Sequence, residues 1–398
     1  MVKFKNIIYV WSEVKLFLIS YLLFLFITTA LQLIVVYFSL DVDGIQTIDS
    51  KYKIFRLMIP FFVITLLLFL FRDRIYFLKR KDLFHYTLFC FYLLLLPLLF
   101  CVVGYFASES NCSAKIEGVK KVKDPLLGYK YQPMGKRKET LFYKNTFVKT
   151  VSYSYDSFGR RSMPYHLQPT KVILFFGCSF TYGDGVNDNE TLPYYVYMKD
   201  TNSNVFNYAV DGYGPQQAYV LSRDLDLKKE INNGNANGVY VYIEDHVKRA
   251  IPCKSHFWGW TNIFPAFVLE KDNLVYKGNL QSTYPFKAIL FSLLNNSLFF
   301  SGIDVPQTTT EKEYQLVAAL IAKTGENFKR QFTTGNFSVF IYPNQDTAIV
   351  QFLRKRNITV IIPPNILPSD SLYFFPHHGH PTPLANKIVA NYLYSKLY

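Results

Sequence analysis

Cysteine, tryptophan and acidic residues are scarce in this chain of 398 residues. It has 5 cysteines and 3 tryptophans, and 29 acidic residues stand against 43 lysines and arginines. No cysteine spacing is of a zinc type, so we expect no metal site and no cofactor. Cys112 and Cys253 could pair in an oxidising compartment, although no spacing supports a disulfide. The formal charge of +14 is spread along the chain, so it favours anionic lipid headgroups or acidic glycans over nucleic acid as partners.

Charged residues are also missing from two long N-terminal stretches. Residues 16–40 and 83–108 contain none, and each can cross a hydrocarbon core that takes about 20 residues. A shorter apolar run, 57–71, is flanked by Arg56 and Arg72, whose charged ends can reach outward. The first run is too long for a signal peptide, which is the alternative interpretation. The sequence therefore predicts a membrane domain over residues 1–108 with three transmembrane helices.

Basic residues set the expected orientation of these spans. Residues 72–82 carry five lysines and arginines, whereas residues 41–53 carry two lysines against three aspartates. Loops rich in lysine and arginine stay in the cytoplasm. We therefore expect a multi-pass protein of the cytoplasmic membrane whose C-terminal domain lies outside, in the periplasm if the cell is bacterial.

Beyond the membrane domain, one strand and the turn after it organise the chain. The apolar run 172–176 predicts a buried strand, and Gly177 ends it. A turn at this point places the next side chains at the carboxyl edge of an open sheet, where α/β folds bind their ligands. Ser179 is therefore a candidate nucleophile, and a helix N-cap is its alternative role.

Strands and helices alternate over residues 166–398, and this alternation predicts a parallel sheet covered on both faces. The predicted strands are 172–176, 205–210, 239–243, 337–342 and 358–362. The predicted helices are 190–200, 215–228, 311–330, 345–356 and 383–397. An insertion at about 251–310 holds a hairpin around 271–273 and an apolar helix at 286–300. This insertion is either a lid or acyl-binding wall over the site, or part of the core.

Residues 109–165 are polar and basic, with short alternating runs such as 147–155 that predict strands. We expect a small β-rich lead-in that packs against the C-terminal domain. A flexible tether is the alternative.

Further motifs follow the later strands. Gly212 lies in a Gly-bearing turn, residues 244–246 read Glu-Asp-His, and residues 380–382 read His-Pro-Thr. Together with Gly-Cys-Ser-Phe-Thr at 177–181, this order resembles the SGNH (GDSL-type) hydrolase superfamily over roughly residues 171–398. The resemblance implies a flavodoxin-like three-layer α/β/α domain and a serine hydrolase that acts on ester bonds, either an esterase or an O-acyltransferase.

The resemblance also implies roles for individual residues. Ser179 is the nucleophile and His380 the base, with His377 and His378 as competitors. The oxyanion donors are the backbone N–H groups of Ser179 and Gly212, and a residue without Cβ lets the backbone approach the reacting oxygen.

Two family residues are missing. The superfamily usually has an Asp shortly before the catalytic His, so Asp370 is our candidate to orient His380, and a Ser–His dyad is the alternative. An Asn donor is absent after the third strand, so His246 is the candidate third oxyanion donor, or else a structural residue. We expect Asp184 and Glu190 to cap or orient the helix that follows Ser179.

The sequence thus predicts a membrane-anchored SGNH-type acyl esterase or O-acyltransferase acting on ester groups of an envelope glycan or lipid. The alternative is a degenerate, non-catalytic SGNH domain that binds a glycan as an assembly partner. The expected partners are the membrane and the acylated substrate. A transferase would also need a multi-span partner to carry the acyl group, because the predicted spans have no charged residue at their centres.

Overall fold

The computed structural model describes residues 112–143, 146–231, 235–257, 260–296, 309–376 and 379–397. The three predicted membrane spans lie outside these ranges. Within the ranges, no helix has both the length and the apolar character that crossing a membrane requires.

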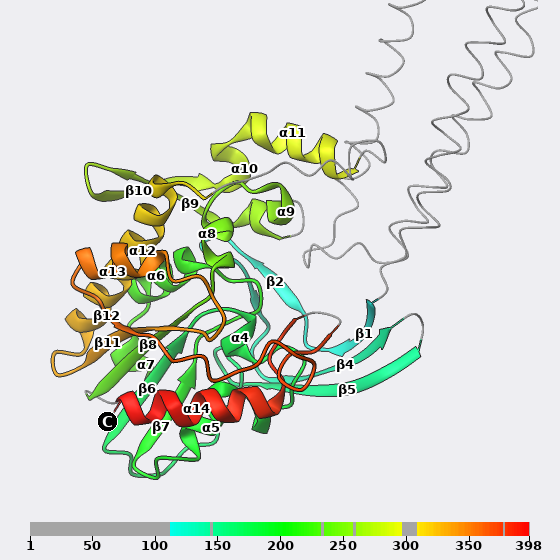
Figure 1. Cartoon of the computed structure of the whole chain (residues 1–398), viewed down its shortest axis with the longest axis vertical. Coiled ribbons are helices and arrows are strands. Elements are labelled where there is room, and N and C mark those ends of the chain that lie inside the picture. The colour runs from blue at the N-terminus through cyan, green and yellow to red at the C-terminus, as the bar shows by residue number, and fades with distance from the viewer. Residues whose placement is uncertain are drawn as a thin grey trace, which may run out of the picture. The chain divides into compact units, whose positions relative to one another are not determined.

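Five parallel strands form the central sheet (Figure 1). They are β6 (Lys171–Phe176), β7 (Ser203–Asn207), β8 (Ala236–Tyr242), β11 (Asn336–Ile341) and β12 (Thr359–Ile361). Their spatial order is β12-β11-β8-β6-β7, in which the first strand in sequence lies between the second and the third. This is the flavodoxin-like order, so the parallel sheet predicted from the sequence is confirmed.

Helices cover both faces of this sheet. On one face, Ile173 and Phe175 of β6 join a core with residues of α5 (Leu192–Tyr197) and α14 (Pro383–Leu397). Phe176 points to the other face and contacts Phe337 of β11, which packs on Phe328 of α12 (Glu311–Gln331). Neighbouring residues of a strand point to opposite faces, so a continuous apolar run such as β6 serves both layers.

The remaining helices of the α/β region are short. The predicted helix 215–228 is divided into α6 (Pro215–Asp224) and α7 (Leu227–Ile231), because the backbone is extended at Leu225. The last helix before β12 is α13 (Ile349–Lys355). After β6 come α4 (Ser179–Tyr182) and the 3-10 turn η1 (Asp188–Glu190).

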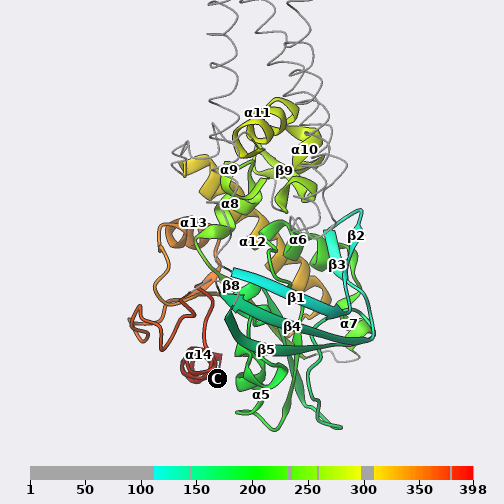
Figure 2. The ribbon, with the colours of Figure 1, turned by 90° about the vertical axis from the view of Figure 1, so that its right-hand side faces the viewer.

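The lead-in is β-rich, as predicted. A three-stranded antiparallel sheet is formed by β1 (Cys112–Gly118), β4 (Gly135–Tyr143) and β5 (Thr146–Tyr155), with β4 in the middle. A separate hairpin is formed by β2 (Lys121–Asp124) and β3 (Gly128–Tyr131). Figure 2 shows β1, β4 and β5 side by side on the face turned to the viewer.

The insertion contains the predicted hairpin and several short helices. Strands β9 (Pro265–Glu270) and β10 (Asn273–Asn279) pair antiparallel. Lys271 and Asp272 both have positive φ, 47° and 66°, as a tight two-residue turn requires. The helices of the insertion are α9 (Lys254–Phe257), η2 (Thr261–Ile263), α10 (Leu280–Thr283) and α11 (Pro285–Asn296). The helix α8 (Asp245–Ala250) precedes the insertion and follows β8. Cys253 is a buried free thiol, so the disulfide considered for it is not formed.

Candidate active site

Ser179 is the first residue of α4, directly after the central strand β6. The turn between them requires Gly177, whose φ is +153° and whose added Cβ would lie 2.4 Å from Thr181 Oγ1. Ser179 is 4% exposed. Because the first N–H groups of a helix have no partner within it, the amide of Ser179 is available to bind an oxyanion.

The strand order places this serine where ligands bind in open α/β sheets. β6 lies between β7 and β8, so the chain leaves toward α5 on one face after β6 and toward α12 on the other face after β8. Such a change of direction opens a crevice at the carboxyl ends of the two strands. Ser179 follows β6 at this edge of the sheet.

His380 lies in a loop that packs against α4. The carbonyl of His380 accepts the N–H of Phe375 at 2.9 Å, and the N–H of Thr382 donates to Tyr373 O at 2.9 Å. The His380 ring lies 5.6 Å from the Phe180 ring, measured between centroids. The structure therefore brings His380 to the helix that begins with Ser179, whereas His377 and His378 lie outside the described residues.

A carboxylate faces His380, and it belongs to Asp184. Asp184 Oδ2 lies 3.6 Å from His380 Nε2, and the two side chains are 33% and 19% exposed. This distance is longer than a hydrogen bond, so Asp184 acts through its charge and favours the imidazolium form. Burial lowers the pKa of His380 below its ordinary value, and the negative charge of Asp184 opposes this shift. His380 is therefore neutral, and ready to accept a proton, at pH 7.

Asp370, the carboxylate chosen from the sequence, does not take this place. Its side chain is exposed and accepts the N–H of Leu372 at 2.9 Å. Short aspartates commonly cap a turn two residues on in this way. The structure pairs His380 with Asp184 instead, five residues after the nucleophile. We expected Asp184 to cap a helix, and only Glu190 does so, through the N–H of Asn187.

A buried arginine fixes the loop that carries Asp184. Arg161 is 2% exposed and donates to the carbonyls of Tyr182, Gly183 and Val186. Its charge is balanced by Asp188 at 2.9 Å. One guanidinium thus binds three carbonyls of the loop. These hydrogen bonds fix the backbone on both sides of Asp184 and therefore help to place its carboxylate.

Gly212 lies in the loop after β7, beside the end of β6. Its φ is +83°, and an added Cβ would lie 2.3 Å from Tyr129 Oη. Trp260 Nε1 donates to the Gly212 carbonyl at 3.3 Å. The neighbouring Asp211 carboxylate accepts from Lys121 Nζ and Tyr131 Oη, both at 2.7 Å. The lead-in hairpin and the insertion therefore both hold the second predicted oxyanion loop.

His246 is fully buried. Its side chain is 0% exposed, and its Nδ1 lies 2.9 Å from Tyr240 Oη. Burial lowers the pKa of His246 well below its ordinary value. The structure therefore supports the alternative role, a structural histidine of α8, over that of a third oxyanion donor.

Arg249, on the same helix, is a residue that the sequence did not reveal. It is 6% exposed and donates to the Tyr213 carbonyl at 2.9 Å. Its charge also lies within electrostatic reach of the thiol of Cys178, the residue before Ser179. One guanidinium thus connects the Ser179 turn with the Gly212 loop. No motif pointed to this role, because a lone arginine three residues after His246 has no spacing that marks it.

The charge of Arg249 is matched by Asp245, whose Oδ2 lies 3.0 Å from Arg249 Nη2 and 2.8 Å from His256 Nε2. Burial alone would raise the pKa of Asp245, but the His256 hydrogen bond and the Arg249 charge together hold it well below its ordinary value. Asp245 therefore anchors the arginine and is not available as a proton acceptor.

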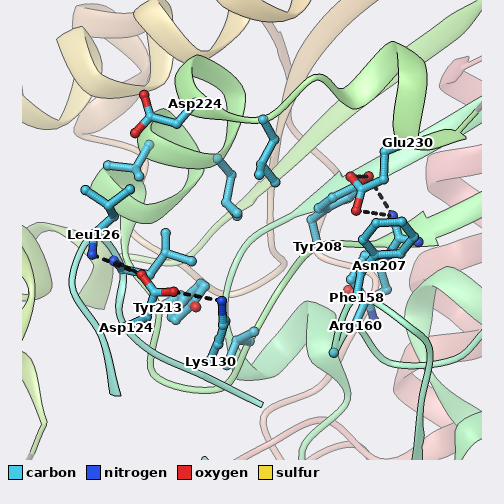
Figure 3. Close-up of a pocket in the computed structure, with 16 residues that line it drawn as sticks. Asp124, Leu126, Lys130, Phe158, Arg160, Asn207, Tyr208, Tyr213, Asp224 and Glu230 are labelled. Carbon is cyan, nitrogen blue, oxygen red and sulfur yellow. Dashed lines mark hydrogen bonds and ion pairs between the residues drawn. The ribbon is translucent and has the colours of Figure 1, made fainter. Parts of the chain in front are cut away.

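A pocket of about 330 Å³ lies elsewhere, between the β2–β3 hairpin and α6 (Figure 3). Four of its charged residues form two pairs, Arg160 with Glu230 at 3.4 Å and Lys130 with Asp124 at 3.0 Å. None of the candidate catalytic residues lines it. This pocket is therefore not the site that the sequence predicts around Ser179.

No model of a protein family and no curated protein matches the chain. Three similar solved structures can be compared. A member of the lipolytic protein G-D-S-L family from Veillonella parvula DSM 2008 is 14% identical, over 56% of this chain and 97% of its own, with a TM-score of 0.30. The psychrotrophic esterase EstA from Pseudoalteromonas sp. is 12% identical, over 57% and 96%, with a TM-score of 0.30.

The acetyl xylan esterase Est2A from the rumen bacterium Butyrivibrio proteoclasticus is 8% identical, over 72% of this chain and 87% of its own, with a TM-score of 0.36. At these values the similarities carry no argument by themselves. The functional proposal rests on the positions of Ser179, His380 and Asp184.

Proposed function

We propose that the C-terminal domain is a serine esterase that hydrolyses acyl esters in the crevice at Ser179. The observation that carries the proposal is the convergence of three groups. Ser179 opens a helix at the switch point of the sheet, the loop of His380 packs on that helix, and Asp184 lies 3.6 Å from His380 Nε2. Nucleophile, base and charge partner are the parts that acyl transfer through serine needs.

The chemistry follows from these groups. Ser179 Oγ attacks the acyl carbon while His380 accepts its proton, and the negative charge of Asp184 stabilises the imidazolium that forms. The oxyanion of the tetrahedral intermediate accepts from the N–H groups of Ser179 and Gly212. His380 then gives its proton to the departing alcohol, which leaves an acyl ester on Ser179. Water, deprotonated by His380, releases the acid and restores the serine.

The substrate class follows from the expected position of the domain. The positive-inside pattern places everything after residue 108 outside the cytoplasmic membrane. Ester groups within reach there belong to envelope glycans and lipids. We therefore propose an O-acylated envelope glycan or lipid as the substrate of a membrane-anchored esterase.

The test uses the full-length protein in detergent micelles with a short-chain p-nitrophenyl ester. We expect Ser179→Ala and His380→Ala each to lower kcat/KM about a thousandfold or more, because nucleophile and base act as a unit. Ser395→Ala is the matched control, since this exposed serine bonds only the Tyr392 carbonyl within α14.

Full activity of Ser179→Ala would show that the site is assigned wrongly. A wild-type protein that binds the glycan but hydrolyses no ester would favour the non-catalytic alternative.

A further inference from the structure

The lead-in sheet turns one face toward the loop that carries Asp184. Alternate side chains of a strand share a face, and on β5 Val151, Tyr153 and Tyr155 are all buried. The Tyr153 ring stacks on the Tyr182 ring of α4, with centroids 5.7 Å apart. The sheet therefore contacts the segment that immediately follows Ser179.

The Tyr153 hydroxyl is bonded on both sides within that loop. It accepts the N–H of Gly185 at 3.0 Å and donates to Asp184 Oδ1 at 3.5 Å. The other carboxylate oxygen of Asp184 is the one that faces His380. The two oxygens of Asp184 are thus divided between Tyr153 of the lead-in and the proposed catalytic base.

A second carboxyl group lies on the same face of the sheet as Tyr153. Glu139 lies on β4, in register with Val151 of β5, and its side chain is 14% exposed. Val151 and Tyr153 are alternate residues of β5, so Glu139 and Tyr153 are diagonal neighbours on one face. When it is ionised, Glu139 repels the Asp184 carboxylate.

The surroundings of Glu139 set its ionisation. Burial and the nearby charge of Asp184 raise the pKa of Glu139 to about 7, and Asp211 adds to the rise. Arg137, whose Nη2 lies 4.0 Å from Glu139, opposes it, and Lys149 of β5 is a further cation within electrostatic reach. A protonated Glu139 does not disturb the Asp184 carboxylate, whereas an ionised Glu139 repels it.

We propose that Tyr153 and Glu139 are positioning residues of the esterase site, and that the lead-in sheet is part of the catalytic unit. Tyr153 holds the Asp184 carboxylate in place beside His380. When Glu139 ionises, its charge repels Asp184 and works against this position. The inference rests on the proposed esterase function, in which Asp184 stabilises the imidazolium of His380.

The first test compares two buried tyrosines on the same face of β5. Tyr153→Phe keeps the ring and removes the hydroxyl, and we expect kcat to fall about tenfold with little change in KM, the equivalent of one pKa unit of His380. Tyr155→Phe is the matched control, because the Tyr155 hydroxyl bonds Tyr182 Oη at 2.6 Å and not Asp184. Both variants are made in the full-length protein, and their thermal midpoints are recorded.

The second test is the pH profile of Glu139→Gln. In the wild type we expect kcat/KM to decline as pH rises through about 7, where Glu139 ionises. The glutamine variant keeps the acceptor oxygen but cannot ionise, so this decline is absent. The acid limb belongs to His380 and is unchanged. A decline of equal size and position in both proteins would overturn the role of Glu139.

The Ser179→Ala variant separates this inference from the esterase proposal. If Ser179→Ala is inactive while Tyr153→Phe and Tyr155→Phe lose the same small fraction of kcat, the esterase stands and Tyr153 is merely structural. If Ser179→Ala is fully active, the esterase site itself is wrong.

Discussion

At the scale of single residues, the charge partner of His380 comes from an unexpected place in the chain. In the superfamily that the sequence resembles, the acid precedes the histidine. Here the acid follows the nucleophile by five residues, and its carboxylate lies 3.6 Å from His380 Nε2. A carboxylate can stabilise an imidazolium from any direction. A site can therefore keep this function after the usual aspartate is lost.

The Asp184→Asn variant tests this replacement. Asp184 raises the pKa of His380, so its loss moves the acid limb of the kcat/KM profile to lower pH. The plateau falls about tenfold, because an opposite charge at this distance is worth at least one pKa unit of stabilisation for the imidazolium. Both changes appear in a profile measured from pH 4 to pH 8.

Asp370→Asn is the matched control for this experiment. The exposed Asp370 caps the Leu372 amide, and the asparagine retains an acceptor oxygen there. A loss in Asp370→Asn equal to that in Asp184→Asn would restore the choice that the sequence suggested.

The sequence predicted single residues only where a local motif marks them. Ser179 and His380 each stand next to a turn and a helix start, and for this reason the sequence could single them out. Asp184 was noticed but assigned to a helix cap, because an acid shortly after a strand is most often a cap. No sequence motif identifies Tyr153 or Glu139, because strands β4 and β5 meet the loop after α4 only in the folded chain.

At the scale of elements, α8 matters through Arg249. The sequence suggested His246 of this helix as an oxyanion donor, whereas in the structure Arg249 is the residue of α8 that contacts two loops. The helix buries His246 against Tyr240 and presents Arg249 to the Cys178 thiol and the Tyr213 carbonyl. Both contacts belong to loops that carry the proposed oxyanion donors. Arg249 therefore helps to set the relative position of Ser179 and Gly212, together with the contacts that Lys121 and Trp260 make to the Gly212 loop.

Arg249→Met should weaken both the fold and the activity. The methionine fills similar space but leaves Asp245 without its cation and the Tyr213 carbonyl without its donor. We expect a cost of about 2 kcal/mol, below that of a fully buried pair because Asp245 is partly exposed, and a fall in the thermal midpoint of roughly 4–8 °C. Arg223→Met, which removes the exposed pair with Asp224, should change the midpoint very little. Equal shifts in the two variants would contradict a special role for Arg249.

The sequence predicted strands and helices well where the spacing of apolar residues reflects which side of the element is buried. The five strands of the parallel sheet, the lead-in strand 147–155 and the hairpin at 271–273 all appear in the structure. β7 ends at Asn207, earlier than expected, because the Asn207 side chain accepts the N–H of Ala209. The spacing of apolar residues also did not predict the break of helix 215–228 at Leu225. Leu225 is itself apolar, so its extended backbone leaves no mark in that spacing.

At the scale of the whole molecule, segments far apart in sequence converge on the loops around one serine. The β2–β3 hairpin binds Asp211, the insertion binds Gly212 through Trp260, and β5 reaches Asp184. The lead-in is thus an ordered sheet in contact with the site and not a free tether. Along the chain, it follows the last predicted span.

This arrangement bears on whether the acyl group goes to water or to another alcohol. Outside the membrane we expect no pool of activated acyl thioester, so a transferase would need a carrier that brings the acyl group across. The apolar runs 16–40, 57–71 and 83–108 contain no charged residue, and groups that line a membrane path are usually ionisable or polar. An esterase needs no such path, because its acyl group is already on the substrate.

We therefore expect the full-length protein in liposomes to release acid from an O-acylated glycan, with little transfer to an added sugar. Released acid and acylated sugar are measured in the same reaction by mass spectrometry. As the control, Ser179→Ala should form neither product, which assigns both products to the Ser179 site. Efficient transfer with negligible hydrolysis, together with a multi-span protein that co-purifies with the chain, would reverse the assignment. The same acyl-Ser179 intermediate would then be passed to a sugar hydroxyl, and the crevice would have to exclude water after the first half-reaction.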